Sequence, residues 1–168
     1  MAKKTRHVVK TSLIIVGEGA HDHAFLSHMK DLYHNGMTNQ SVKIEPADGG
    51  SPKDIIDVAI KKSKIADYDK RYVLMDSDIP VSTEERLHAK KKKIVLLFSE
   101  PICLEGMLLE VLGEKAPATN KACKDKLHPQ LAGKPTEKQS YRVKFPKPVL
   151  DTTMKQTIVD LRKLIANQ

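Results

Sequence analysis

Acidic residues follow the apolar, β-branched runs of this chain, in types and spacings suited to binding a cation. Glu18 and Asp22 come just after the first such run, and Asp76 and Asp78 come after a later one. Side chains at i and i+2 of an extended segment project to one side, so the two aspartates can face one hard cation. An Asp-x-Asp pair also occurs in ordinary turns. We therefore expect Glu18, Asp76 and Asp78 to be ligands of Mg²⁺ or Mn²⁺.

Other chemistry-bearing residues give weaker patterns. Glu105 lies on the shoulder of an apolar helical stripe, where a carboxylate is either paired with a Lys or Arg or used in a site. His21 and His23 diverge by about 200° on a helix and do not readily share one ion, so both are interpreted as surface polar groups. His128 has no companion at ligand spacing, and Cys103 is expected to be a small buried group.

The elements that must position these residues alternate between strand and helix. Buried-type strands are predicted in four apolar runs: Ser12–Val16, Val42–Ile44, Tyr72–Met75 and Ile94–Phe98. Helix stripes lie between and after them, with Ser51-Pro52 and Ser82-x-x-Glu85 as helix starts. Such alternation predicts an α/β fold with a central parallel sheet of about four strands and helices on both faces. A terminal amphipathic helix is predicted from Met154, Ile158, Leu161 and Ile165.

Basic residues are concentrated in one segment. Lys115–Pro148 holds nine Lys or Arg against two acids, so it carries +7 of the net charge of +8, together with five of the nine prolines. This composition is typical of an extended loop or small subdomain laid along a polyanion, or of a mobile solvated loop. We expect a single domain over residues 1–168, with an α/β core over 11–113, a basic loop or subdomain over 114–149 and a C-terminal helix over 150–168.

Length and composition exclude several classes of protein. A chain of 168 residues with 40% hydrophobic residues is one domain's worth and can bury a core. Only 4% of residues are aromatic and Trp is absent, which argues against base-stacking platforms. The two cysteines form no metal knuckle, and no apolar run approaches the roughly 20 residues of a membrane span. We expect a soluble cytoplasmic protein without membrane contact.

Three ordered motifs resemble those of a known family. Glu18-Gly-x-x-Asp22-x-x-Phe25 resembles the Glu-Gly-x-x-Glu-x-x-aromatic signature of Toprim-type domains, with Asp in place of the commoner Glu. Asp76-Ser-Asp78 resembles their Asp-x-Asp. The block Ser99-Glu-Pro-Ile-Cys-Leu-Glu105-Gly-Met-Leu-Leu109 resembles that of the RloB-like proteins, a Toprim-related prokaryotic family. The resemblance covers about residues 12–112 and, more loosely, Tyr141–Ile165.

This resemblance implies a Toprim-like, Rossmann-like fold and a metal-dependent phosphoryl-transfer site. Glu18 would act as general acid or base, with Asp22 and Glu105 as further catalytic groups and Asp76 and Asp78 as the Mg²⁺ or Mn²⁺ ligands. Lys144 is our expected cation near the scissile group. The implied activity is a metal-dependent nuclease of nucleic-acid processing or phage defence, acting on RNA or DNA, with an ATPase as partner protein.

Two other functions use the same residues. A non-catalytic nucleic-acid-binding or adaptor domain would keep the fold and the basic segment without binding a cation. A small-molecule phosphohydrolase would use the acids but show little dependence on salt or on the basic segment. Metal binding and salt dependence separate these alternatives.

Overall fold

The computed structural model describes residues 10–168. Its elements, in chain order, are β1 (Thr11–Gly17), α1 (Ala20–Tyr33), β2 (Gln40–Pro46), α2 (Pro52–Ser63), β3 (Lys70–Asp76), α3 (Thr83–Lys91), β4 (Ile94–Ser99), α4 (Leu104–Val111), α5 (Asn120–Leu127), η1 (His128–Gln130), η2 (Lys138–Tyr141), α6 (Lys147–Thr152) and α7 (Gln156–Ala166). Within these residues no helix is both long and apolar enough to cross a membrane.

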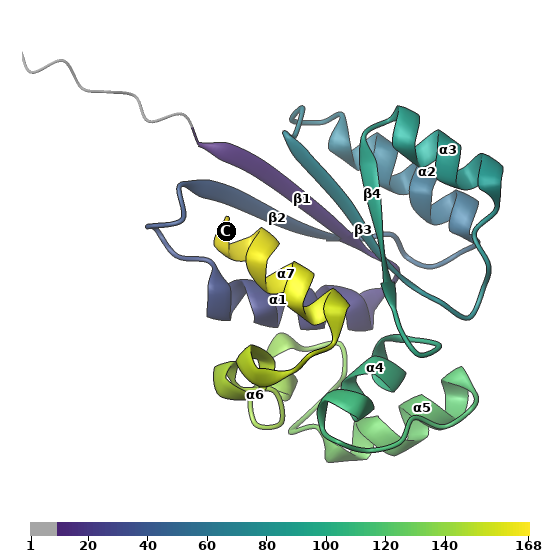
Figure 1. Ribbon diagram of the computed structural model, residues 1–168, viewed down its shortest axis with the longest axis vertical. Coiled ribbons are helices and arrows are strands. Elements are labelled where there is room, and N and C mark those ends of the chain that lie inside the picture. Colours follow the sequence, from purple (N-terminus) through teal and green to yellow (C-terminus); the bar gives the residue numbers. More distant parts are fainter. Residues whose placement is uncertain (1–9) are drawn as a thin grey trace, which may run out of the picture.

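The four strands form one parallel sheet in the order β2-β1-β3-β4, as the alternation of strand and helix patterns predicted. Helices α1 and α7 cover one face of the sheet, and α2 and α3 cover the other (Figure 1). The fold is thus an α/β sandwich consistent with a Rossmann-like arrangement. Because β1 leads to β2 on one side and β3 leads to β4 on the other, the strand order reverses between β1 and β3.

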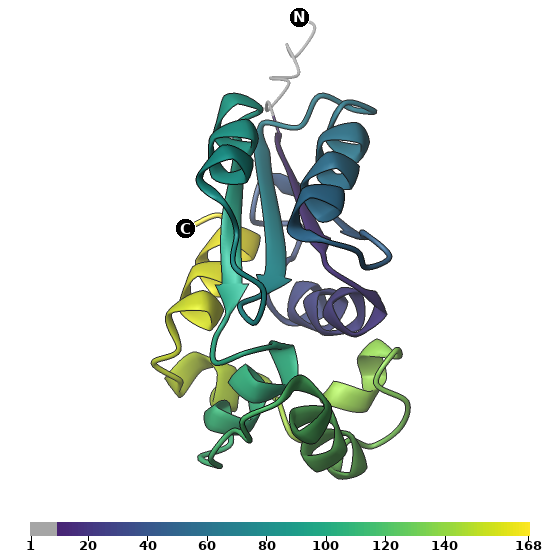
Figure 2. The ribbon, with the colours of Figure 1, turned by 90° about the vertical axis from the view of Figure 1, so that its right-hand side faces the viewer.

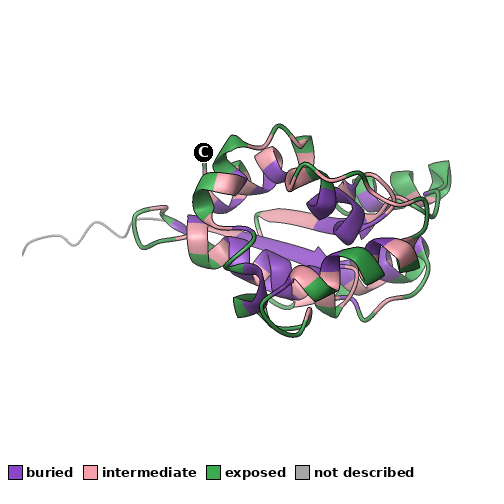
Figure 3. Cartoon of the chain, turned by 90° about the horizontal axis from the view of Figure 1, so that it is seen from below, coloured by how far each residue is buried: buried purple, intermediate pink, exposed green. Residues whose placement is uncertain are grey.

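Two apolar layers hold the sheet between its helices. Along β1, Leu13 and Ile15 point into the α1 side, whereas Ile14 and Val16 point into the α2 side, and all four are at most 1% exposed. This alternation follows from the two-residue period of a strand, and burial on both faces explains the continuous apolar run. Figure 3 shows the buried strand between helices whose outer faces are exposed.

The helix starts predicted from the sequence are confirmed. The Ser51 hydroxyl accepts a hydrogen bond from the Asp54 amide, and Ser82 accepts one from the Glu85 amide, each at the N-cap of its helix. The stripe expected for the terminal helix is correct at Ile158, Leu161 and Ile165 but wrong at Met154. Met154 is 89% exposed because α7 begins only at Gln156, after extended backbone.

The basic segment, called the basic subdomain below, is folded into short helices and turns. It contains α5, η1 and η2 and packs below the carboxyl ends of the strands (Figure 2). Cys123, Leu127, Tyr141 and Phe145 are at most 1% exposed and join the core on the α1 side of the sheet. These apolar residues fix the subdomain against α1 and α4, so its polar side chains also have defined positions beside the strand ends.

Candidate functional site

The acidic residues predicted to form a site meet where the strand order reverses. Glu18 follows β1, and its amide donates a hydrogen bond to the Leu74 carbonyl of β3 over 3.0 Å. The Glu18 carboxylate accepts a 2.8 Å hydrogen bond from the amide of Asp76, the last residue of β3. Ligands of open α/β sheets bind in the crevice at such a switch point.

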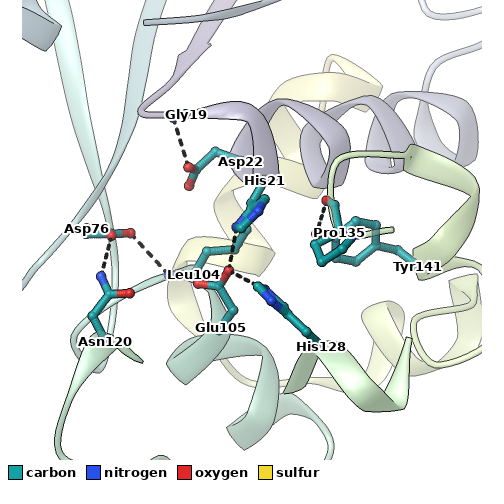
Figure 4. Close-up of polar contacts among 10 residues, drawn as sticks. All are labelled: Gly19, His21, Asp22, Asp76, Leu104, Glu105, Asn120, His128, Pro135 and Tyr141. Atoms are coloured by element: carbon teal, nitrogen blue, oxygen red, sulfur yellow. Dashed lines mark hydrogen bonds and ion pairs between the residues drawn. The ribbon is translucent and has the colours of Figure 1, made fainter. Parts of the chain in front are cut away.

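Asp76 is held by the two segments that follow β4. Its Oδ1 accepts from the Leu104 amide at the start of α4, over 3.2 Å. Its Oδ2 accepts from the side-chain amide of Asn120, the first residue of α5, over 3.1 Å (Figure 4). These contacts fix the carboxylate and leave lone pairs on both oxygens for a further partner.

Asp22 lies in the first turn of α1, and its two carboxylate oxygens have different environments. Its Oδ2 accepts a 3.1 Å hydrogen bond from the Gly19 amide, which closes the helix start. Its Oδ1 is buried and has no hydrogen-bond partner, although the residue is only 7% exposed. A buried carboxylate oxygen without a partner is unfavourable. The unpartnered Oδ1 of Asp22 is thus suited to bind a cation or a proton.

Glycine allows this close packing of strand and helix. A Cβ at Gly17 would lie 2.7 Å from the Cβ of Asp22, so any side chain there would displace the carboxylate.

Burial and mutual repulsion raise the pKa values of the clustered carboxyl groups. Burial, followed by the charge of Glu18, raises the pKa of Asp76 to about 7. Burial and the charge of Asp76 raise the pKa of Asp22 well above its usual value. Burial also raises the pKa of Glu18, with smaller contributions from Asp78 and Glu105 and an opposing one from its hydrogen bond to Asp76. The electrostatic repulsion among these carboxylates decreases when a cation or protons bind to them.

These carboxylates line one open cavity of about 260 Å³. Its wall comprises Glu18, Gly19, Ala20, His21, Asp22, Gly49, Asp76, Glu105 and Lys124. Asp78 is exposed and lies in a smaller adjoining hollow, which it shares with Glu18 and Asp76. Ser77, between the two aspartates, turns away and donates to the Ser99 carbonyl of β4.

The turn after β4 supports the Asp76–Asp78 loop through its backbone. The Ile102 carbonyl accepts hydrogen bonds from the amides of Ser77 and Asp78, over 2.9 and 3.0 Å. Ile102 adopts φ of +67°, and the Cys103 amide donates to the Pro101 carbonyl across it. A β-branched residue at this φ is strained. The strained backbone of this turn positions the Ile102 carbonyl to accept from the loop amides. It also positions the Leu104 amide to donate to Asp76.

A second group of side chains adjoins the cavity and is centred on Glu105. His21 Nδ1 and His128 Nε2 each lie 2.9 Å from the same atom, Glu105 Oε1 (Figure 4). Burial raises the pKa of Glu105, but the hydrogen bonds from the two histidines outweigh it and hold the pKa at about 2. The three ligand atoms lie within 4.8 Å of one another, so this group can hold a metal ion.

The sequence-predicted residues are brought together with one exception. Glu18, Asp22, Asp76 and Glu105 share the cavity wall, with Asp78 beside it. Lys144 is exposed and does not line that wall, where Lys124 is the only lysine among the described residues.

Three contributors were missed from the sequence, and one was misinterpreted. Asn120, Lys124 and His128 all come from the basic subdomain, whose placement depends on tertiary packing. His21 is not a plain surface group, because it is paired with Glu105. For Glu105 the sequence left two alternatives open, an ion pair with a Lys or Arg and a role in a site. In the structure its partners are two histidines, His21 and His128. Cys103 is fully buried as expected, and burial raises the pKa of its thiol.

Comparison with known proteins gives no assignment, since no family model, curated protein or solved structure matches the chain. Function must therefore be argued from the geometry of the site itself.

Proposed function

We propose that the protein is a hydrolase of phosphodiester bonds in nucleic acid that depends on Mg²⁺ or Mn²⁺. The observation that carries this proposal is the convergence of Glu18, Asp22 and Asp76 on one cavity at the switch point of the sheet, with one buried Asp22 oxygen unpartnered. Carboxylate oxygens are the donors that hard divalent cations prefer. The order of the acidic motifs further supports a Toprim-type, RloB-like relationship.

The residues fit such a cation. Asp76 and Asp78 would hold it, beside Glu18 in the hollow that all three line, and Gly19 orients Asp22. A bound divalent cation polarises a phosphate and lowers the pKa of a bound water. The positive charge would also remove the repulsion that raises the pKa values of these carboxyl groups in the metal-free protein.

The remaining groups of the cavity can handle the proton and the phosphate. The carboxylate of Glu18 is held by a single backbone contact, which suits a group that passes a proton as general acid or base. Lys124, which also lines the cavity, can neutralise a phosphate oxygen, in the role that the sequence had suggested for Lys144.

Nucleic acid is the substrate class that the basic subdomain favours. Of the nine Lys and Arg between residues 115 and 148, all except Lys124 are exposed. The helices of this segment lie beyond the carboxyl ends of the strands (Figure 2), so a polyanion bound there would pass the strand ends. Binding through phosphates makes affinity fall steeply with salt. A small-molecule substrate of a phosphohydrolase would not need to contact this basic surface.

The test is cleavage of labelled RNA and DNA, single- and double-stranded, with Mg²⁺ or Mn²⁺. Glu18→Gln should lower the cleavage rate at least about 100-fold, because proton transfer contributes that much. Asp67→Asn is the matched control: Asp67 is 96% exposed, lies before β3 at the far end of the sheet, and has a positive φ that Asn tolerates. Salt-dependent binding of all substrates without metal-dependent cleavage would contradict the hydrolase and favour the adaptor function.

A further inference from the structure

We infer that His21, Glu105 and His128 form a second metal site, which takes a transition-metal ion of the Zn²⁺ class and is separate from the carboxylate site. The inference does not depend on the proposed hydrolase. It rests on the identity of the donors, on the convergence of three segments on one atom, and on an open approach from the cavity.

The donor set differs from that of the neighbouring carboxylates. Two imidazole nitrogens and one carboxylate oxygen are available within 4.8 Å of one another. Imidazole suits Zn²⁺ and related first-row ions, whereas Mg²⁺ prefers oxygen donors alone. Two histidines with one glutamate, and a fourth position left open, make up a known type of catalytic zinc site.

The three ligands come from segments far apart in the chain. His21 lies in the first turn of α1, Glu105 in the first turn of α4, and His128 directly after α5. The two rings meet edge to face with centroids 4.8 Å apart, and each directs one nitrogen to Glu105 Oε1 (Figure 4).

The three side chains are partly buried, and the open cavity gives an ion access to them. Glu105 is 3% exposed, while His21 and His128 keep 29% and 24% of their side chains exposed. Glu105 and His21 also line the open cavity, so an ion could enter and keep a water or substrate oxygen as fourth ligand.

The carboxylates of the other site lie along the same cavity wall. Glu18 and Asp76 share this wall with His21 and Glu105. A phosphate group in the cavity would therefore have a transition-metal ion on one side and the carboxylate-bound cation on the other. The experiment must separate the two sites.

The experiment is titration of untagged, chelator-treated protein with Zn²⁺ by calorimetry, and with Co²⁺ by visible absorption. We expect one Zn²⁺ per chain and a Co²⁺ spectrum of low coordination number with imidazole ligands. His128→Gln and Glu105→Gln should each weaken Zn²⁺ binding at least about tenfold, since even partners outside the ligand shell change affinity by that much. Both readouts are independent of catalytic activity.

Two control variants identify the site. His23→Gln removes a histidine from the same turn of α1 that has no place in the triad, and it should bind Zn²⁺ like the wild type. Asp78→Asn should also keep Zn²⁺, although it removes a ligand of the proposed Mg²⁺ site. Loss of Zn²⁺ in Asp78→Asn but not in His128→Gln would overturn the inference.

A structural role for the triad predicts a different pattern. If the histidines serve only to brace Glu105, His128→Gln would lower the melting temperature of the metal-free protein, and Zn²⁺ would shift the melting temperature of neither protein. If the triad binds Zn²⁺, the ion raises the melting temperature of the wild type and of His23→Gln but not of His128→Gln. Absence of Zn²⁺ binding in the wild type would also overturn the inference.

Discussion

Asp76→Asn should stabilise the metal-free protein while removing a cation ligand. Asp76 lies within a cluster of buried carboxylates, and its pKa is raised to about 7, first by burial and next by the charge of Glu18. Asn has nearly the same shape as the protonated acid and carries no charge. Its oxygen can still accept from the Leu104 amide, and Asn120 can turn its own amide by 180° to offer its oxygen to the new NH₂ group.

The magnitude follows from the shift in pKa. A change from 3.8 to about 7 corresponds to about 4 kcal/mol, at 1.36 kcal/mol per pKa unit. Asp76 keeps some exposure to the open cavity and shares its charge repulsion with Glu18 and Asp22, so we expect about 2 kcal/mol at pH 8. For a chain of this length that is about 4–8 °C in melting temperature.

The sign of the pH dependence is also fixed. Because the pKa is higher in the folded state, the folded protein binds more protons than the unfolded chain between pH 3.8 and about 7. The contribution of Asp76 to stability is therefore fully present below pH 3.8 and is lost as the pH rises through about 7. The variant and the wild type should have similar stability near pH 4 and diverge progressively toward pH 8.

The assay is urea unfolding in the presence of a chelator at pH 5 and pH 8, with Asp67→Asn as control. Addition of Mg²⁺ at pH 8 should stabilise the wild type but not Asp76→Asn. If Asp76→Asn destabilised the protein equally at both pH values, Asp76 would be a structural hydrogen-bonding residue and the carboxylate crowding would be unimportant.

Two further substitutions test the packing that positions the site. Leu108→Ala, at a fully buried position of α4, should cost about 2–5 kcal/mol in urea unfolding, and a neutral result would show that this face of α4 is not in the core. Gly106→Ala should both destabilise the protein and weaken Zn²⁺ binding, because the new Cβ would lie 2.3 Å from the Pro101 carbonyl oxygen and would shift Glu105; unchanged stability and Zn²⁺ affinity would contradict this.

Much of the fold could be predicted from local patterns. The period of the apolar residues gives every strand and most helices, and Ser51 and Ser82 mark two helix starts through their own hydroxyl groups. Met154 was misplaced because apolar spacing alone does not show where a helix begins. The true start of α7 at Gln156 leaves that side chain exposed.

The gathering of the carboxylates was also predictable, because Glu18, Asp76 and Asp78 follow apolar runs and the carboxyl ends of parallel strands lie along one edge of the sheet. Asn120, Lys124 and His128 were not, because they belong to a segment whose charge and prolines conceal its core. Leu127, Tyr141 and Phe145 are scattered between Pro-containing turns, so no helical or strand period reveals that they are buried. Only the packed structure brings His128 to Glu105 and shows that His21 faces the same atom.

The central claim is that the cavity between β1 and β3 binds a divalent cation through carboxylates. Calorimetric titration of Mg²⁺ and Mn²⁺ into the wild type, Asp78→Asn and Asp67→Asn tests it without knowledge of the substrate. We predict binding to the wild type and to Asp67→Asn, and binding weakened at least about tenfold in Asp78→Asn. Equal binding to all three proteins, or to none of them, would contradict the claim.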